Sequence, residues 1–290
     1  MKSDTLRDRL FIASQYLLPH HLLSRLAGRL ADCQVRWLKN LAIRLFVRHY
    51  QVNLQEALTE EPGGYASFNE FFARPLKAEA RPLAAAPAIL SPCDGDISQL
   101  GRIEQGRIFQ AKGHNFGLID LLGGDHRLAS PFMGGQFATL YLSPRDYHRI
   151  HMPVAGTLRQ MIHVPGRLFS VNPLTTRQVP ELFARNERVI CLFDTALGPM
   201  ALVLVGAMIV ASIETVWAGR VTPLRREVRS IRYDEQARAA IQLERGEEMG
   251  RFRLGSTVIV LFGTDCMQWA SALASGQTVR QGGALGQPPG

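Results

Sequence analysis

Two adjacent residues near the C-terminus could support a reaction of the chain with itself. Gly255 and Ser256 stand directly before the apolar run Val258–Phe262, which is short, rich in β-branched residues and typical of a buried strand. Gly255 has no Cβ, so its carbonyl carbon can be approached closely and its backbone can hold strained dihedral angles. The hydroxyl of Ser256 could therefore attack that carbonyl. A Gly-Ser-Thr tripeptide is more often a plain turn before a strand, so this interpretation depends on partners elsewhere in the chain.

Acidic and imidazole side chains occur in two upstream segments. The turn-rich stretch Ser-Pro-Cys-Asp-Gly-Asp carries Asp94 and Asp96, and a second stretch carries His148 and His151, three residues apart. Serine is a weak nucleophile until a base accepts its proton, and a carboxylate can orient that base and stabilise the imidazolium that forms. Chemistry alone allows either aspartate to be the orienting group. The chain therefore contains the parts of a Ser-His-Asp constellation.

Six motifs surround these residues, in an order and at a length that chance does not explain. They are Phe71-Phe72-Ala73-Arg74-Pro75-Leu76-Lys77, Pro92-Cys93-Asp94-Gly95, Tyr147-His148-Arg149-Ile150-His151-Met152-Pro153, Val164-Pro165-Gly166-Arg167-Leu168-Phe169-Ser170-Val171-Asn172-Pro173, Leu182-Phe183-Ala184-Arg185-Asn186-Glu187-Arg188 and Leu254-Gly255-Ser256-Thr257. Together they resemble the phosphatidylserine decarboxylases, a family of pyruvoyl-dependent membrane enzymes, in its short bacterial form. The resemblance extends from about Phe68 to Phe262.

The resemblance implies that the chain makes its own pyruvoyl group by self-cleavage. The Ser256 hydroxyl would attack the Gly255 carbonyl and convert the peptide bond into an ester. β-Elimination would then break the ester and leave dehydroalanine, which hydrolyses to pyruvoyl and ammonia. The products would be chains 1–255 and 256–290, held together as a heterodimer by a shared sheet. The resemblance also allows a homodimer of that unit.

The family motifs also imply a role for each side chain. Asp94, His151 and Ser256 match the family's self-cleavage triad, which selects Asp94 over Asp96. We expect His151 to be the base and Asp94 to orient it. His148 is expected to act in the decarboxylation step, either as a proton donor to the carbanion or as a group that orients the carboxylate. A structural histidine bonded to the backbone is the alternative for His148.

The implied reaction converts phosphatidylserine into phosphatidylethanolamine and CO₂, a step of phospholipid biosynthesis. Loss of CO₂ from an amino-acid head group needs an electron sink. A pyruvoyl ketone provides one by forming a Schiff base with the substrate amine. Pyridoxal phosphate is the common alternative, but neither Lys77 nor Lys112 lies in a stretch that resembles a phosphate cradle. No bound metal is expected either, because the four cysteines form no CxxC pair.

Positive charge is concentrated at the N-terminus. The formal net charge is +8, and residues 1–50 contribute +6 of it. Three apolar stripes at helical spacing share this segment: Leu6, Leu10, Ala13 and Leu17; Leu22, Leu23, Leu26, Ala27 and Leu30; and Val35, Leu38, Ala42, Leu45 and Phe46. Basic amphipathic helices of this kind lie in a bilayer interface, although most amphipathic helices pack on their own protein. We expect an anionic membrane surface as partner and no nucleic acid, since the rest of the chain carries only +2.

The expected location is the cytoplasmic face of the cell membrane, as a peripheral protein. Scattered cysteines favour a reducing compartment, and the start of the chain lacks the uninterrupted apolar core of a secretory signal. The longest apolar run, 200–213, is too short and too interrupted to span a bilayer.

The elements that must hold these residues predict an α+β fold, with N-terminal amphipathic helices on a mostly antiparallel β body. Residues 1–66 are expected to form a membrane-associating helical segment. A β-rich catalytic domain follows over 67–274, where short apolar runs alternate with Gly and Pro turns. The Gly-, Gln- and Pro-rich residues 275–290 predict a disordered tail.

Two other functions are compatible with parts of this pattern. A Ser-His-Asp hydrolase would use the same side chains, but the sequence around Ser256 is not the G-x-S-x-G of a nucleophile elbow. A basic membrane- or nucleic-acid-binding module would carry its charge over the β body. The low charge beyond residue 50 argues against that module.

Overall fold

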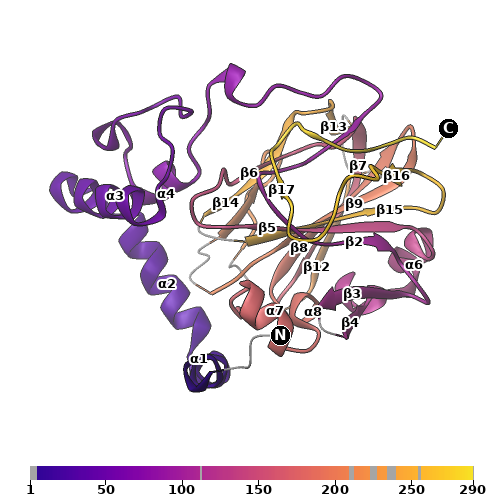
Figure 1. Cartoon of the computed structure of the whole chain (residues 1–290), viewed down its shortest axis with the longest axis horizontal. Helices are drawn as coiled ribbons and strands as arrows, with labels where there is room; N and C mark the ends of the chain where they lie inside the picture. The colour runs from indigo at the N-terminus through magenta and orange to yellow at the C-terminus, as the bar shows by residue number, and fades with distance from the viewer. Residues whose placement is uncertain are drawn as a thin grey trace.

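The computed structural model describes residues 5–111, 113–208, 212–222, 227–233, 240–253 and 256–289, with Ser256 described by its backbone alone. Three helices lie along one side of a β body (Figure 1): α1 (Leu6–Leu17), α2 (His20–Ala31) and α3 (Arg36–Tyr50). Thr5 and Asp8 form a capping box at the start of α1. Pro19 separates α1 from α2, and Gln51 ends α3 in the left-handed conformation (φ 53°).

Many apolar side chains of α1, α2 and α3 face solvent instead of the β body. Polar and small residues of α1 and α2, including Gln15, His20 and Ser24, are buried. Large apolar residues are exposed instead: Leu6, Leu10, Leu17, Leu22, Leu26, Leu30, Val35, Trp37, Leu41 and Leu45. A soluble helix normally buries its apolar stripe against the core. Within the described chain, no helix combines the length and apolarity that crossing a bilayer requires.

A short helix joins the N-terminal helices to the β body. Ser67 caps α4 (Phe68–Phe72) by accepting a hydrogen bond from the Glu70 amide, as the Ser-x-x-Glu pattern predicts. The phenyl rings of α4 pack with Ile43 of α3 in a small core of their own. Two 3₁₀ turns flank this region, η1 (Pro62–Gly64) and η2 (Ala78–Ala80).

A central antiparallel sheet contains nine of the described strands, in the order β12-β7-β8-β9-β15-β5-β2-β17, with β13 also paired to β7. Their bounds are β2 (Gly95–Arg102), β5 (Gln136–Leu142), β7 (Gly156–Val164), β8 (Arg188–Thr195), β9 (Gly198–Val205), β12 (Arg229–Arg232), β13 (Gln242–Leu243), β15 (Ser256–Phe262) and β17 (Thr278–Val279). The apolar run Val258–Phe262 is buried along its whole length, because β15 lies in the interior of the sheet. This strand therefore belongs to the main hydrophobic core.

Smaller sheets and short helices surround the central sheet. One sheet has the order β11-β10-β14-β6, a second has the order β1-β18-β16, and β3 pairs with β4. The strands are β1 (Ile89–Leu90), β3 (Arg107–Ala111), β4 (His114–Gly117), β6 (Arg149–His151), β10 (Ser212–Thr215), β11 (Gly219–Arg220), β14 (Glu248–Arg253), β16 (Gln268–Trp269) and β18 (Ala284–Gln287). The helices are α5 (Leu118–Leu121), α6 (His126–Ala129), η3 (Ser130–Phe132), α7 (Pro173–Gln178) and α8 (Leu182–Arg185).

The predicted α+β class is confirmed, with helices first and a mostly antiparallel body after them. The C-terminal residues differ from the prediction. Composition predicts disorder over 275–290, but β17 and β18 are ordered strands that pair with β2 and with β1 and β16. Val279 and Leu285 are buried in the main core. Pairing with strands from the start of the β body, rather than local composition, orders this segment.

Candidate active site

The ends of three neighbouring strands bring the predicted site residues together at one end of the central sheet. Strand β15 begins at Ser256, which pairs with Leu142 at the end of β5. On the other side of β5, Asp96 near the start of β2 pairs with Tyr141. The start of β15, the end of β5 and the start of β2 therefore lie together, and Asp94 directly precedes β2. The segment that carries His148 and His151 follows the end of β5, so it starts from the same end of the sheet.

The chain changes sheets at the predicted cleavage site. Strand β14 ends at Arg253 and pairs with β10 and β6 in the smaller sheet. Strand β15 pairs instead with β5 and β9 in the central sheet. Gly255 lies outside the described residues, and of Ser256 only the backbone is described. A break between these two residues would cut the connection between two sheets and leave the pairing of β15 intact.

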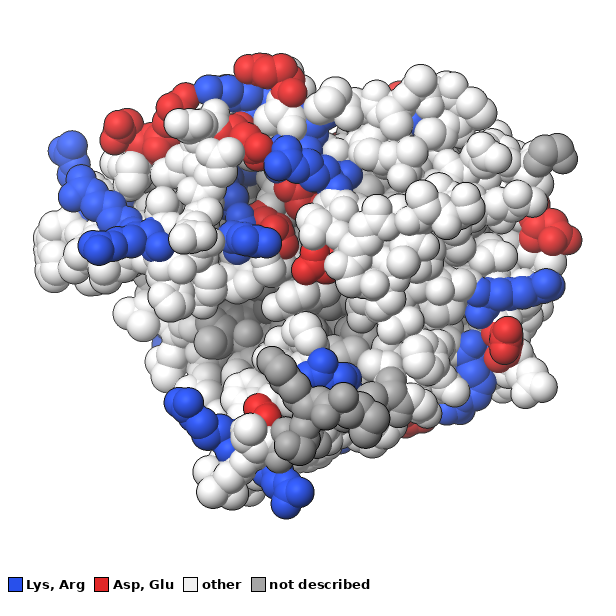
Figure 2. Space-filling model, viewed as in Figure 1, with Lys and Arg blue, Asp and Glu red and all other residues white. Residues whose placement is uncertain are grey.

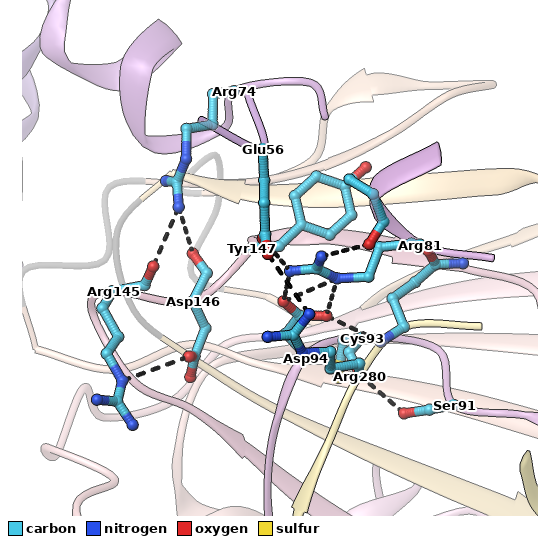
Figure 3. A network of polar contacts seen from close by, with 12 residues as sticks. Glu56, Arg74, Arg81, Ser91, Cys93, Asp94, Arg145, Asp146, Tyr147 and Arg280 are labelled. Atoms are coloured by element: carbon cyan, nitrogen blue, oxygen red, sulfur yellow. Dashed lines mark hydrogen bonds and ion pairs between the residues drawn. The ribbon is translucent and has the colours of Figure 1, made fainter. Parts of the chain in front are cut away.

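Asp94 is held by Arg81, which lies outside the six sequence motifs. Nε of Arg81 donates to Oδ1 of Asp94 (2.9 Å), and the terminal nitrogen of Arg81 lies 2.5 Å from Oδ2 (Figure 3). The backbone N–H of Gln281 donates to Oδ1 (2.8 Å), and Glu56 pairs with Arg81 from the other side (2.9 Å). Burial opposes the charge of Arg81, but its bonds to Asp94 and Glu56 raise its pKa overall.

A glycine makes this position of Asp94 possible. Gly95 has a φ of 150°, and a Cβ at that residue would lie 2.4 Å from the carbonyl oxygen of Tyr141. Any other residue would therefore force β2 and β5 apart. Cys93, on the other side of Asp94, is fully buried, as expected for a space-filling thiol. Burial raises the pKa of the Cys93 thiol well above its usual range, so it is a poor nucleophile.

His151 is oriented by a tyrosine and a backbone carbonyl. Its Nδ1 lies 2.8 Å from the carbonyl oxygen of Gly246, and its Nε2 lies 2.9 Å from the hydroxyl of Tyr147. A carbonyl can only accept, so Nδ1 carries the proton and Nε2 holds the lone pair. Burial lowers the pKa of His151, and the nearby Glu248 and Asp94 oppose that shift only in part. The ring is therefore a neutral base with a defined tautomer, and the described bonds of Asp94 go to Arg81 and Gln281 instead.

His148 is completely buried and has one nitrogen without a partner. Its Nε2 donates to the carbonyl oxygen of Ser143 (3.1 Å), and its Nδ1 has no hydrogen-bond partner among the described residues. Burial, reinforced by the charge of Arg74, lowers the pKa of His148 to about 3. The carbonyl of His148 accepts from the amide of Phe252 (3.0 Å), close to the end of β14. The segment that carries His148 thus lies between β14 and the end of β5.

A small cavity opens beside Asp94. Its volume is about 200 Å³, and its lining includes Arg74, Arg81, Asp94, Tyr147 and Arg280. Four arginines and three carboxylates line it. Figure 3 shows the ion pairs of three of these arginines, whereas Arg74 donates to backbone carbonyls. Among the described residues, no group of three or more His, Cys, Asp or Glu is arranged to hold a metal ion.

The orienting groups of the site carry little sequence signal. Tyr147 lies within the histidine motif, but its spacing to His151 does not reveal a bond. Arg81 is a single charge directly before an Ala- and Pro-rich stretch. The Gly246 carbonyl is a backbone group far from His151 in sequence, and every residue type has such a carbonyl, so the sequence does not identify it.

Comparison with protein families finds two matches. Residues 68–287 match the model described as phosphatidylserine decarboxylase, and residues 10–51 match a model described as PSD. Similar curated proteins include the phosphatidylserine decarboxylase proenzymes of Stutzerimonas stutzeri (67% identical) and Bordetella pertussis (68%), each aligned over 97% of this chain and 95% of the relative. The proenzyme of the same name from Pseudomonas fluorescens is 66% identical, over 97% of this chain and 98% of the relative.

Proposed function

Because the chain belongs to the phosphatidylserine decarboxylase family, we propose that it decarboxylates phosphatidylserine with a pyruvoyl group made from its own Ser256. The chain is accordingly a lyase of phospholipid biosynthesis, made as a proenzyme. The observation that carries the proposal is the change of sheet between β14 and β15. Cleavage there frees the end of β14, while β15 stays paired on both sides.

Self-cleavage begins with attack of Ser256 Oγ on the Gly255 carbonyl carbon. The peptide C–N bond breaks, and an ester to Oγ and a free amine on residue 256 form. Removal of the Ser256 α-proton then expels the Gly255 carboxylate from Cβ and leaves dehydroalanine. Its tautomer reacts with water to give the ketone and ammonia. His151 is the proposed base, because its Nε2 carries a lone pair and its pKa keeps it neutral.

Asp94 supports this step through its charge, without a hydrogen bond to the His151 ring among the described contacts. The negative charge of Asp94 raises the pKa of His151 and so favours the imidazolium that forms on it. Arg81 and the amide of Gln281 fix the Asp94 carboxylate in place. Gln281 belongs to the smaller product chain, so the carboxylate also ties the two chains together.

The residues around Ser256 fit a pyruvoyl group. When present, that group supplies the electron sink for loss of CO₂. The next residue, Thr257, has a buried hydroxyl without a hydrogen-bond partner among the described residues. That hydroxyl is available as a donor to the carbonyl oxygens that the group would carry. The backbone pairing of Thr257 with Tyr141 and Val205 holds this end of β15 on both sides.

His148 is the proposed proton carrier of decarboxylation. The substrate amine arrives as an ammonium and must lose a proton before it can react as a nucleophile. The negative charges of the substrate oppose the burial that keeps the pKa of His148 low in the free protein. Nδ1 of His148, with its unused lone pair, then takes that proton and returns it to the α-carbon after CO₂ has left. The electron pair of the broken C–C bond forms the new C–H bond. Because Nδ1 of His148 carries no proton at rest, it must accept one from the substrate before it can donate one to the α-carbon.

The N-terminal helices are the proposed membrane anchor. Their leucines and Trp37 are exposed, while polar residues of α1 and α2 face the protein. Figure 2 shows basic side chains at the side of the molecule that carries these helices. Apolar side chains framed by Lys and Arg suit the interface of an anionic bilayer. All four cysteines are free, in keeping with a cytoplasmic face.

The mass of the denatured protein tests the proposed function. We expect a 255-residue chain and a 35-residue chain, the smaller lighter than a serine-ended peptide by one ammonia. Ser256→Ala should give one intact chain without decarboxylase activity. Ser275→Ala is the matched control, because Ser275 lies in the same product chain but is exposed. An intact chain that still turns over phosphatidylserine would overturn the role of Ser256 and favour a hydrolase-like use of the same side chains.

A further inference from the structure

We propose that residues 72–74 at the end of α4, here called the α4 clamp, position His148 for decarboxylation. The proposal rests on the role given to His148 above and adds the residues that make this role possible. Phe72, Ala73 and Arg74 lie far from the histidine segment in sequence. They contact it at three successive points.

Each residue of the clamp holds a different part of the histidine segment. The Phe72 ring stacks on the His148 imidazole, with centroids 4.0 Å apart and planes 24° apart. The carbonyl oxygen of Ala73 accepts from Nε of Arg149 (2.9 Å). A terminal nitrogen of Arg74 donates to the carbonyl oxygens of residues 145 and 146 (3.0 and 3.3 Å; Figure 3). The clamp therefore holds the backbone before His148, the His148 ring itself and the side chain of the residue that follows it.

The stack determines the state of the His148 ring as well as its place. Phe72 covers one face of the imidazole, and the ring has no solvent exposure. Water would otherwise hydrate Nδ1 and favour the imidazolium. With water excluded, the ring keeps one proton, on the nitrogen that donates to Ser143. The stack thus preserves the lone pair that the proposed proton transfer needs.

The burial of the Arg74 guanidinium is energetically unfavourable. Its side chain is 3% exposed, and its Nε and one terminal nitrogen have no hydrogen-bond partner among the described residues. A buried guanidinium with unused donors is unfavourable, and burial lowers the pKa of Arg74. Its face lies over the Phe71 ring (5.5 Å). A cation held there both bridges the two carbonyls and disfavours protonation of His148.

The other side of α4 is held by the N-terminal helices. Phe46 of α3 packs edge-on against Phe68, Phe71 and Phe72, with centroids 5.1 to 5.9 Å apart. Asn69 donates to Asp32 at the C-terminus of α2 (2.7 Å). The helices proposed to meet the membrane therefore connect to His148 through a single short helix.

The pH dependence of decarboxylation tests the clamp. Phe72→Leu keeps an apolar side chain but admits water to His148, so the pKa of His148 should rise towards its ordinary value of about 6.5. We expect kcat/KM on mixed micelles of detergent and phosphatidylserine to fall about ten-fold between pH 7.5 and 5.5 beyond any fall in the wild type. Phe68→Leu is the matched control: it makes the same change in the same helix, and its ring stacks on Phe72 rather than on His148. It should keep the wild-type profile.

A second measurement does not depend on self-cleavage or turnover. In the Ser256→Ala proenzyme, NMR titration of the His148 ring should give a higher pKa with Phe72→Leu or Arg74→Lys than without them. The lysine keeps the charge but cannot bridge both carbonyls as the guanidinium does. An unchanged His148 pKa, or equal profiles for Phe72→Leu and Phe68→Leu, would overturn the clamp. Neither result would affect the proposed function, which instead fails if the wild-type chain remains intact and active.

Discussion

The hydroxyl of Tyr147 donates a hydrogen bond to Nε2 of His151 across 2.9 Å, because Nδ1 already donates to the carbonyl of Gly246. The lone pair that the proposed base would offer to Ser256 is therefore already engaged by a phenol. Burial raises the pKa of Tyr147, so the phenol stays protonated at physiological pH. A neutral phenol can accept the serine proton while it passes its own proton to His151.

Tyr147→Phe should accordingly slow self-cleavage about ten- to a hundred-fold, since one member of the proton path is lost while the fold is retained. Cleavage would be followed by gel after pulsed cell-free synthesis. His151→Ala is the reference and should stop cleavage. Faster cleavage in Tyr147→Phe would mean that the phenol competes with Ser256 for Nε2.

Asp94→Asn should destabilise the proenzyme as well as impair cleavage. The Arg81 and Asp94 side chains are each 9% exposed, and loss of the carboxylate charge leaves Arg81 without its closest partner. Removing one member of a buried ion pair costs about 3–5 kcal/mol. Urea unfolding in the Ser256→Ala background would measure this loss without any difference in processing. Glu56→Gln is the control, because Glu56 also pairs with Arg81 but is 25% exposed, and it should cost much less. Equal losses in the two variants would contradict a special role for Asp94.

The free energy of unfolding should decrease as the pH is lowered, partly because of His148. The folded state holds this ring neutral down to a pKa of about 3, whereas the unfolded chain protonates it below about 6.5. The unfolded state then binds one more proton, so stability is lost as pH falls, by about 1.4 kcal/mol per pH unit below 6.5. His148→Gln should remove this part of the slope between pH 6.5 and 5, as measured by urea midpoints in the Ser256→Ala background. An unchanged slope would mean that His148 is hydrated in solution.

The sequence predicts the architecture well because its local patterns agree with the final fold. The apolar stripes before residue 50 form helices, and the run Val258–Phe262 is a buried strand. The order of β17 and β18 could not be predicted, because strands of two to four residues gain stability from their partners rather than from their own composition.

The site divides in the same way. The residues with reactive side chains stand in recognisable motifs, whereas the groups that orient them do not. His151 is oriented by a hydroxyl and a carbonyl, and His148 by a phenyl ring from α4. Such contacts depend on sheet register and on the packing of α4, which single-sequence patterns do not specify. The outward direction of the N-terminal leucines is likewise a result of docking, since helical spacing alone also allows them to face the core.

The exposed stripe of α3 provides the last prediction. Trp37, Leu41 and Leu45 follow one another at helical spacing and are 70%, 49% and 60% exposed. Deleting residues 1–50 would test membrane binding poorly, because it also removes Ile43 from the core that supports α4. Replacing the three exposed residues by Ser leaves that core intact and should weaken binding to phosphatidylglycerol-containing vesicles about ten-fold or more for each residue removed. Flotation at rising salt would measure the affinity, which should be salt-sensitive because the same helices carry the basic charge. Phe109→Ser is the control, since this side chain is 42% exposed on β3, away from the helices. If the triple variant floats as the wild type does, α3 is not the membrane face.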